Sequence, residues 1–302
     1  MIKKFLKKII PWKIVNFVKR CLVYFPFEKS NDYNGKILQE FSFKNSLKDN
    51  ICIFSHYDKD DIIDDYVVNY IKNISEQNFD IVFVSTAEHL HIDEIEKIKD
   101  YCRDIIVKEN IGYDFGAWAT GIIYIDKEVN SYKSLLLCND SVYAPLFPLN
   151  EMFDKMKNRY DFWGITDSHE IYHHLQSYFM VFENSVVTSK LFKDIWKNYK
   201  VYSIKRNIIL QYEIGISQKL IKNGYLMGAY CPFNSLDSLK ICNATHFQWR
   251  ELIEKLRCPI VKVELLRDNP KNINIFKWQY FIKQQCNYDV GLIEKHLSRV
   301  SD

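Results

Sequence analysis

The chain has 302 residues, of which 47% are hydrophobic and 26% are charged. These values are typical of globular proteins, and the low counts of 9 Gly and 7 Pro exclude collagen-like and low-complexity chains. A chain of this length buries enough apolar surface to fold without disulfides or a structural metal. Its 8 cysteines include no C-x-x-C pair, so we expect free thiols in a reducing, cytoplasmic compartment.

The net charge of +3 is concentrated at the start of the chain. Residues 1–28 contain no acid before Glu28, and their basic residues alternate with aromatic and aliphatic ones such as Phe5 and Trp12. This composition predicts a basic amphipathic helix that lies on an anionic membrane surface, peripheral on the inner face of the cell membrane. Charges interrupt it too often for a membrane span, and no signal-peptide cleavage site follows it. A helix packed on the domain is the alternative.

The rest of the chain has more acidic than basic residues, so nucleic acid is not an expected partner. After a polar stretch with few strand signals (29–50), short apolar runs alternate with helical patterns. Strands are predicted at 51–55, 80–85, 104–107 and 134–138, with helices between them at 61–75, 92–100 and 116–124. The alternation predicts an α/β fold with a mostly parallel central sheet covered by helices.

From about residue 146 the spacing of the elements changes. Strands are predicted at 161–165 and 177–182, followed by helices at 186–199, 204–222 and 247–256. No Gly/Ser-rich linker divides the chain, so we predict one continuous domain over 50–275 and a helical extension over 276–302.

Three loops are predicted at the carboxyl ends of the parallel strands, where such sheets bind ligands. The first is Ser55, His56, Tyr57 and Asp58. The second is Asn110–Gly116, which opens a helix; its glycines, including Gly112, allow a close approach of backbone to an anion, although the G-x-G-x-x-G fingerprint is absent. The third is Asn139, Asp140 and Ser141, where Asp140 is well placed to hold a divalent cation that bridges two phosphates. Ordinary structural turns are the alternative in each case.

Two further residues are candidates for chemistry. Glu213 falls on the same face of the predicted helix 204–222 as Ile216 and Leu220, and a carboxylate buried there is costly unless it is paired or acts as a base. His246 is a candidate for a late metal or phosphate contact, with simple packing beside Phe247 and Trp249 as the alternative.

Residues His169–His173 match H-E-x-x-H, the helical zinc motif of metallopeptidases. That chemistry needs both histidines on one face of a stable helix. The predicted strands on either side leave room for barely two helical turns, so we interpret the match as coincidental. Neither G-x-S-x-G nor a P-loop occurs, which disfavours serine hydrolases and P-loop enzymes.

Several short motifs, in the same order, resemble the rhamnan synthesis protein F family over roughly residues 50–275. They are IGYDFGAW (111–118), LCNDSVY (137–143), PLFP (145–148), FWGIT (162–166), HLQSYF (174–179), YEIG (212–215), THF (245–247) and LLRDNP (265–270). The resemblance implies a bacterial glycosyltransferase of cell-surface polysaccharide synthesis, such as O-antigen of lipopolysaccharide or capsule. It also implies a GT-A-like nucleotide-sugar-binding fold, with a donor half at about 50–145 and an acceptor half at about 146–275.

The resemblance also assigns roles to the candidate residues. Asn139-Asp140-Ser141 takes the place of the DxD metal motif, with one carboxylate instead of two, and His246 takes the place of a late metal ligand. Glu213 matches the region of the acceptor-activating carboxylate. Donor contacts are expected from Ser55, His56, Tyr57, Asp58, Asn110, Gly112 and Asp114, and acceptor contacts from His174, Gln176 and Ser177.

The implied reaction transfers a sugar, with rhamnose as a candidate, from a nucleotide-sugar to a lipid-linked or growing glycan by an inverting single displacement. Mg²⁺ or Mn²⁺ is the expected cofactor. The alternative is a non-catalytic sugar- or nucleotide-binding partner of a polysaccharide assembly complex.

Overall fold

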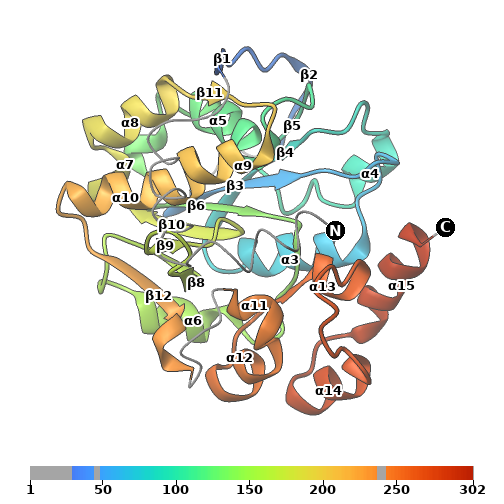
Figure 1. Ribbon diagram of the computed structural model, residues 1–302. Helices are drawn as coiled ribbons and strands as arrows, with labels where there is room; N and C mark the ends of the chain where they lie inside the picture. Colours follow the sequence, from blue (N-terminus) through green and yellow to red (C-terminus); the bar gives the residue numbers. More distant parts are fainter. Residues whose placement is uncertain (1–28, 44–47, 237–242, 302) are drawn as a thin grey trace, which may run out of the picture.

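The computed structural model describes residues 29–43, 48–236 and 243–301, so the predicted amphipathic segment at 1–28 lies outside the described residues. A nine-stranded sheet forms the centre of the fold, in the order β12-β8-β10-β6-β3-β4-β5-β2, with β9 paired to β8 (Figure 1). Its strands are β2 (Ile37–Ser42), β3 (Asn50–His56), β4 (Phe79–Ser85), β5 (Asp104–Lys108), β6 (Ser134–Asn139), β8 (Phe162–Ser168), β9 (His174–Leu175), β10 (Phe179–Glu183) and β12 (Met227–Cys231). The predicted α/β class is confirmed.

The middle of the sheet is parallel: β3 pairs in parallel with β4 and β6, and β4 pairs in parallel with β5. Antiparallel β10 then separates β6 from β8. Two short antiparallel pairs lie outside the sheet: β1 (Asn31–Asp32) with β11 (Lys200–Val201), and β7 (Val142–Tyr143) with β13 (Val261–Lys262). The β7–β13 pair matters for the site because it brings a late segment of the chain beside the residues that follow β6.

Helices cover both faces of the sheet (Figure 1). They are α3 (Asp65–Ser75), α4 (Ile92–Glu96), α5 (Tyr113–Tyr124), α6 (Leu149–Met156), α7 (Asn184–Val187), α8 (Lys190–Lys197), α9 (Lys205–Ile208), α10 (Gly215–Lys222), α11 (Ala244–Phe247), α12 (Trp249–Leu256), α13 (Val263–Arg267), α14 (Trp278–Gln285) and α15 (Val290–Val300). A π-helical turn, η2 (Ile209–Ile214), joins α9 to α10, and the 3₁₀ turns are η1 (Val129–Ser131) and η3 (Phe233–Ser235).

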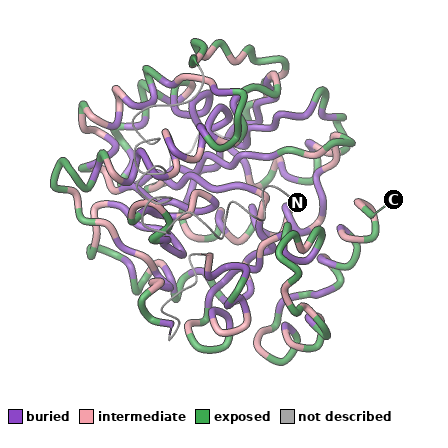
Figure 2. Tube along the Cα trace, viewed as in Figure 1, coloured by how far each residue is buried: buried purple, intermediate pink, exposed green. Residues whose placement is uncertain are grey.

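Two large hydrophobic cores result, one on each face, beside a small cluster of Leu210 and Ile214. Because side chains alternate along a strand, Cys52 and Phe54 of β3 pack in the core that contains Tyr70 of α3, whereas Ile53 packs in the core that contains Trp118 of α5. Figure 2 shows the buried strands crossing the centre of the molecule, with exposed segments around them.

The predicted strands of the parallel region are confirmed, but other elements differ. The polar stretch 29–50 contains the edge strand β2, whose Leu38 and Glu40 are exposed; β2 pairs in the sheet only with β5, so its polar sequence carries no buried run. The helix predicted from residue 61 begins at Asp65, because Asp61 has a φ of 59° and accepts hydrogen bonds from the backbone of Glu88 and His89. The single helix expected at 186–199 is two helices, α7 and α8, and β12 was not predicted.

Among the described cysteines, all six are free. In the same part of the chain, no helix combines the length and the apolar character needed to cross a bilayer.

Candidate functional site

Two carboxylates meet at the carboxyl ends of β3 and β6. Asp140 directly follows β6, and its Oδ2 accepts a hydrogen bond of 2.8 Å from the backbone N–H of Tyr57, which follows β3. Asp114 lies in the first turn of α5, and its Oδ1 accepts a hydrogen bond of 3.0 Å from Ser55. The structure therefore brings together one residue from each of the three predicted loops.

The electrostatics of this pair disfavour its negative charge. Burial raises the pKa of Asp140 well above the ordinary value, and the neighbouring charges of Asp114 and Asp58 raise it further, against the hydrogen bond from Tyr57. Burial likewise raises the pKa of Asp114, although hydrogen bonds from Ser55 and Asn139 oppose the shift. Two carboxylates in this state share a site that favours a cation.

The backbone around Gly112 positions Asp114. Gly112 has a φ of 90°, a left-handed conformation that glycine adopts without strain, and the hydroxyl of Tyr199 donates a 2.9 Å hydrogen bond to its carbonyl. A Cβ at this position would lie 2.9 Å from the Tyr199 hydroxyl oxygen. Gly112 is buried and serves the turn that starts α5, whereas Asn110 is exposed on the preceding loop.

The first loop divides into buried and exposed parts. His56 is buried, with Nδ1 3.0 Å from the Ser85 hydroxyl, and desolvation lowers its pKa to about 4, so the imidazole is neutral. Tyr57 is 55% exposed beside Asp140. Asp58 is ion-paired with Arg299 of α15, so its carboxylate faces the C-terminal helix.

Lys262 of β13 connects this edge with the predicted acceptor side. Desolvation lowers its pKa to about 8, while the charges of Glu213 and Asp114 act in the opposite direction. Its Nζ lies 4.0 Å from the ring centroid of Tyr178. The sequence did not single out Lys262, because only the pairing of β13 with β7 places it next to residues 120 positions earlier.

Glu213 lies in the π-helical turn η2 and lines a cavity of about 400 Å³. Its Oε1 accepts a hydrogen bond of 3.2 Å from the backbone N–H of Ser177, and His174 and Gln176 line the same cavity. The three residues predicted for the acceptor side are thus gathered around Glu213. π-Helical turns occur frequently at functional sites, a signal that the helical spacing of the sequence does not reveal.

His246 is buried on α11, which packs on β13. Its Nδ1 lies 3.2 Å from Oδ1 of Asn243, and its Nε2 lies 3.5 Å from Oε2 of Glu264. Desolvation lowers its pKa, and the positive charge of nearby Lys262 contributes to this shift. The structure thus places His246 near Lys262, with its imidazole engaged by Glu264.

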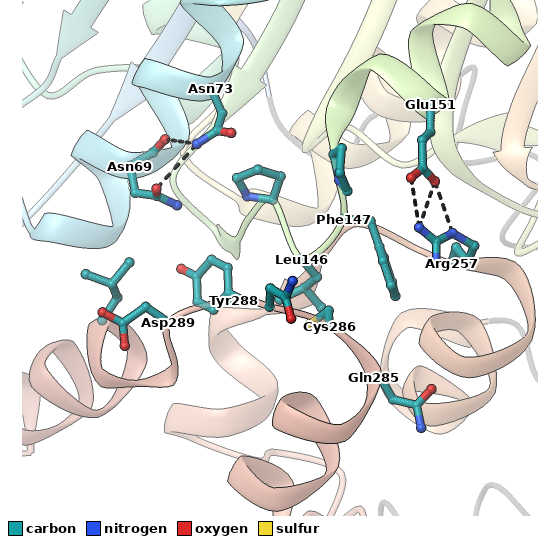
Figure 3. A pocket seen from close by; sticks show the side chains of 14 residues that line it. Asn69, Asn73, Leu146, Phe147, Glu151, Arg257, Gln285, Cys286, Tyr288 and Asp289 are labelled. Carbon is teal, nitrogen blue, oxygen red and sulfur yellow. Dashed lines mark hydrogen bonds and ion pairs between the residues drawn. The ribbon is translucent and has the colours of Figure 1, made fainter.

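A second cavity, of about 620 Å³, lies elsewhere (Figure 3). Asn69 and Asn73 of α3, Leu146 and Phe147, and the segment around Tyr288 line it, and an ion pair of 2.8 Å between Arg257 and Glu151 borders it. It shares no lining residue with the Glu213 cavity and is not part of the candidate site.

Fold and site together define an α/β protein with a mostly parallel central sheet and a carboxylate pair at the carboxyl ends of β3 and β6. The charges of Asp114, from that pair, and of Glu213, from the cavity, both act on Lys262. Residues 81–302 match the family described as Rhamnan synthesis protein F, and the chain belongs to this family.

Two individual relatives share 34% and 25% sequence identity with the chain. An uncharacterized protein of Sinorhizobium fredii (strain NBRC 101917 / NGR234), y4gN, is 34% identical over 180 residues, which cover 56% of this chain and 46% of that protein. The chain therefore matches less than half the length of this relative. Virulence protein VirA of Vibrio anguillarum (strain ATCC 68554 / 775) is 25% identical over 268 residues, covering 77% of this chain and 84% of that protein. Among solved structures, the glycosyltransferase GlyE of Streptococcus pneumoniae TIGR4 aligns with 9% identity and a TM-score of 0.40, over 85% of this chain and 64% of its own.

Proposed function

We propose that the protein is a nucleotide-sugar-dependent glycosyltransferase with a GT-A-like fold. Membership of the rhamnan synthesis protein F family supports this class, as does the mostly parallel sheet flanked by helices. The observation that carries the proposal is the position of Lys262, which the pairing of β13 with β7 places beside the residues that follow β6. The negative charges of both Asp114 and Glu213 act on its ammonium group. A transfer reaction uses a cationic group such as Lys262 to bind the donor diphosphate, and an anionic group such as Glu213 to accept the proton of the acceptor hydroxyl.

Asp140 and Asp114 are the proposed holders of a divalent cation, Mg²⁺ or Mn²⁺. Their raised pKa values show that two negative charges are poorly accommodated here, and a cation relieves that cost. Asp114 supplies from α5 the second carboxylate that the Asn139-Asp140-Ser141 motif lacks. When bound, the cation neutralises phosphate oxygens of the leaving group. His246 remains a predicted additional ligand.

Lys262 is proposed to bind the diphosphate. Its ammonium group is largely removed from water, where a charge interaction with a phosphate oxygen is stronger than in bulk solvent. Lys205 of α9 also acts on the charge of Asp114 and adds positive potential to this edge. The exposed ring of Tyr57 is proposed to stack on the donor base, with Ser55 and Asn139 nearby holding Asp114 in place.

Glu213 is the proposed general base. The acceptor hydroxyl gives its proton to the Glu213 carboxylate as the hydroxyl oxygen bonds to the anomeric carbon of the donor. The bond from that carbon to the diphosphate oxygen breaks in the same step, so the anomeric configuration inverts. The backbone N–H of Ser177 fixes one carboxylate oxygen of Glu213, and the other is available for the acceptor.

The finer features of the substrate rest on the family name and on the N-terminal sequence. We propose rhamnose as the first donor sugar to test, and a lipid-linked or growing cell-surface glycan as the acceptor. The basic segment at 1–28 would then hold the enzyme at the inner face of the membrane that contains this acceptor.

The experiment measures release of nucleoside diphosphate from a panel of sugar nucleotides, including dTDP-rhamnose, with Mg²⁺ or Mn²⁺ and detergent-dispersed glycolipid acceptors. Glu213→Gln is compared with Glu254→Gln, which changes an exposed carboxylate of α12 in the same way. Acceptor-dependent release that disappears in Glu213→Gln and persists in Glu254→Gln supports the proposal.

Two other outcomes would redirect it. Unchanged turnover in Glu213→Gln would mean that another group is the base. A sugar nucleotide that raises the melting temperature without any turnover across the panel would favour the non-catalytic binding partner.

A further inference from the structure

The loop between β8 and β9 gathers two histidines around one buried aspartate. His173 Nε2 lies 2.6 Å from Asp167 Oδ2, and His169 Nε2 lies 4.0 Å from the same oxygen. The two imidazole rings stack with centroids 4.2 Å apart and planes 9° from parallel. One potential ligand atom from each residue falls within 4.8 Å of the others. These are the histidines of the H-E-x-x-H match, brought together without a helix.

The loop is built in a way that differs from the helical motif. Ile171 has a φ of 72°, which is incompatible with a continuing α-helix, and Ser168 Oγ accepts a hydrogen bond from the backbone N–H of Glu170 at 3.1 Å. From α10, the side-chain amide of Gln218 donates a 2.6 Å hydrogen bond to the carbonyl of His173. The loop therefore has a defined path that directs both imidazoles to the end of β8.

Asp167 is oriented from its other side. Its Oδ1 accepts a 2.6 Å hydrogen bond from the backbone N–H of Phe233, which leaves Oδ2 for the histidines. A carboxylate oriented by a backbone donor resembles the hydrogen-bonded ligands of metal sites.

The spacing is close to what a tetrahedral metal needs. Ligand bonds of about 2.0–2.2 Å to zinc place neighbouring ligand atoms roughly 3.4 Å apart. The two measured separations, 2.6 and 4.0 Å, fall on either side of that value. The His169 and His173 side chains are 40% and 42% exposed, so each imidazole has room to shift by the required fraction of an ångström.

We propose that Asp167, His169 and His173 form a binding site for one zinc-type divalent cation, with a fourth position open to water or to a ligand. Two imidazoles and one carboxylate favour Zn²⁺ or Co²⁺ over Mg²⁺, which prefers oxygen ligands. The site is built from other residues than the Asp114–Asp140 pair. Ser168 at the end of β8 and Glu170 and Ile171 of the loop line the Glu213 cavity, so the bound cation would fix one wall of that cavity.

The test measures metal binding, independently of any transfer activity. Chelator-stripped full-length protein is titrated with Co²⁺, whose visible absorption reports four-coordinate nitrogen and oxygen ligation, and Zn²⁺ is then added in competition. We expect about one equivalent to bind and His169→Gln to weaken binding at least about tenfold. His169 is the informative position because its Nε2 is too far from Asp167 to hydrogen-bond with it, so its replacement leaves the hydrogen bonds of the loop intact.

His89→Gln/His91→Gln is the matched control, since these two histidines are exposed on a different loop. The control is expected to bind Co²⁺ as the parent does, and His169→Gln/His173→Gln to lose the visible bands. Equal Co²⁺ affinity in the parent and in both the His169 and the double variant would overturn the proposal. Loss of the bands only in the control would show that the cation binds elsewhere and would overturn it as well.

Discussion

Two groups of carboxylates lie near the carboxyl end of β3. An arginine of the fold neutralises the first group, whereas the second, among the described residues, has hydrogen bonds but no ion pair. In the first, Asp58, Asp60 and Asp64 surround Arg299 of α15, with Asp64 Oδ2 and Asp60 Oδ2 at 2.6 and 3.0 Å from its guanidinium nitrogens. In the second, Asp114 and Asp140 face each other with hydrogen bonds from Ser55, Asn139 and the Tyr57 backbone.

The pKa shifts follow from this difference. Burial raises the pKa of Asp58, but hydrogen bonds from Arg299 and from two backbone N–H groups outweigh it, and the net pKa is lowered. For Asp140, burial and the like charge of Asp114 act together, and the net pKa is raised. A carboxylate that the fold neutralises with its own arginine stabilises the fold; a carboxylate pair whose charge stays costly is suited to binding something from outside.

Asp58 differs from the other residues of the first predicted loop because it has an ion-pair partner within the protein. The sequence predicts Asp58 as a donor contact together with Ser55 and Tyr57. In the structure its carboxylate anchors the C-terminal helix, since both Asp58 and Asp64 are bonded to Arg299. Asp58 has an arginine partner and Asp140 has none among the described residues. That partner, Arg299, lies 241 positions away in the sequence, so no local sequence pattern reveals it.

The largest effect is expected for Asp140→Asn. The variant keeps an oxygen for the Tyr57 N–H but loses the charge that holds the cation, so kcat should fall by about 10²–10³. The melting temperature at pH 7 should rise slightly, because a costly buried charge is removed. The assay is nucleoside-diphosphate release, with Asp126→Asn, an exposed aspartate, as the control. Full activity in Asp140→Asn would show that the pair is not the cation site.

Arg299→Met is expected to act on stability instead. Removing the guanidinium leaves three aspartates without their shared cation, and the free energy of unfolding should fall by about 2 kcal/mol. Urea denaturation measures it, with Arg159→Met, at an exposed position, as the control. The folded variant should keep the parent kcat. A change below about 0.5 kcal/mol, the size ordinary for surface substitutions, would remove the distinction between the two groups.

Lys262 offers a smaller effect with a defined pH dependence. Its ammonium group loses its charge above a pKa of about 8, so kcat/KM, which reports the free enzyme, should decline about tenfold per pH unit above that value. Lys262→Arg retains its charge at these pH values and should flatten the alkaline limb. A parent profile that stays level to about pH 9.5 would contradict the role of Lys262 in diphosphate binding.

The parallel part of the fold was predictable because its strands are continuous apolar runs with both faces buried. Ile51–Ile53 and Leu135–Leu137 are completely buried, and such uninterrupted apolar runs are recognisable as strands from the sequence alone. Strand β2 was missed for the complementary reason, since an edge strand with Gln39 and Glu40 has no such run.

The candidate site was predictable as separate loops but not as an arrangement. The strand–loop–helix order brings Ser55, Asp114 and Asp140 to one edge, as expected for carboxyl ends of parallel strands. Lys262 depends on the β7–β13 pairing, and the π-helical turn at Glu213 has a sequence that also fits an ordinary helix. The histidines at 169 and 173 converge through a loop, so the spacing rule for helices was the wrong test of whether they meet.

The smallest effect, and the one that separates the two carboxylate groups by sign, is the pH dependence of stability. Because the folded pKa of Asp140 is raised, its contribution to stability is complete below the ordinary carboxyl value of 3.8 and declines as the pH rises through the raised value. Asp140→Asn should therefore melt about 2 °C above the parent at pH 7, with the gap closing near pH 4. Asp58 has a lowered pKa, so the stability it gives through Arg299 is present above 3.8 and is lost as the pH falls through the lowered value.

The Arg299→Met deficit should accordingly be full at pH 7 and shrink as the pH falls from the ordinary carboxyl value of 3.8 toward the lowered pKa, at which Asp58 becomes protonated in the folded parent. Melting curves of the parent and both variants from pH 3 to pH 8 measure the two differences together. Both differences in melting temperature then diminish on acidification. At pH 7 the difference is an increase for Asp140→Asn and a decrease for Arg299→Met. If Asp140→Asn melted below the parent at pH 7, the charge of Asp140 would be stabilising. The Asp114–Asp140 pair would then stabilise the fold in the same way as the carboxylates around Arg299.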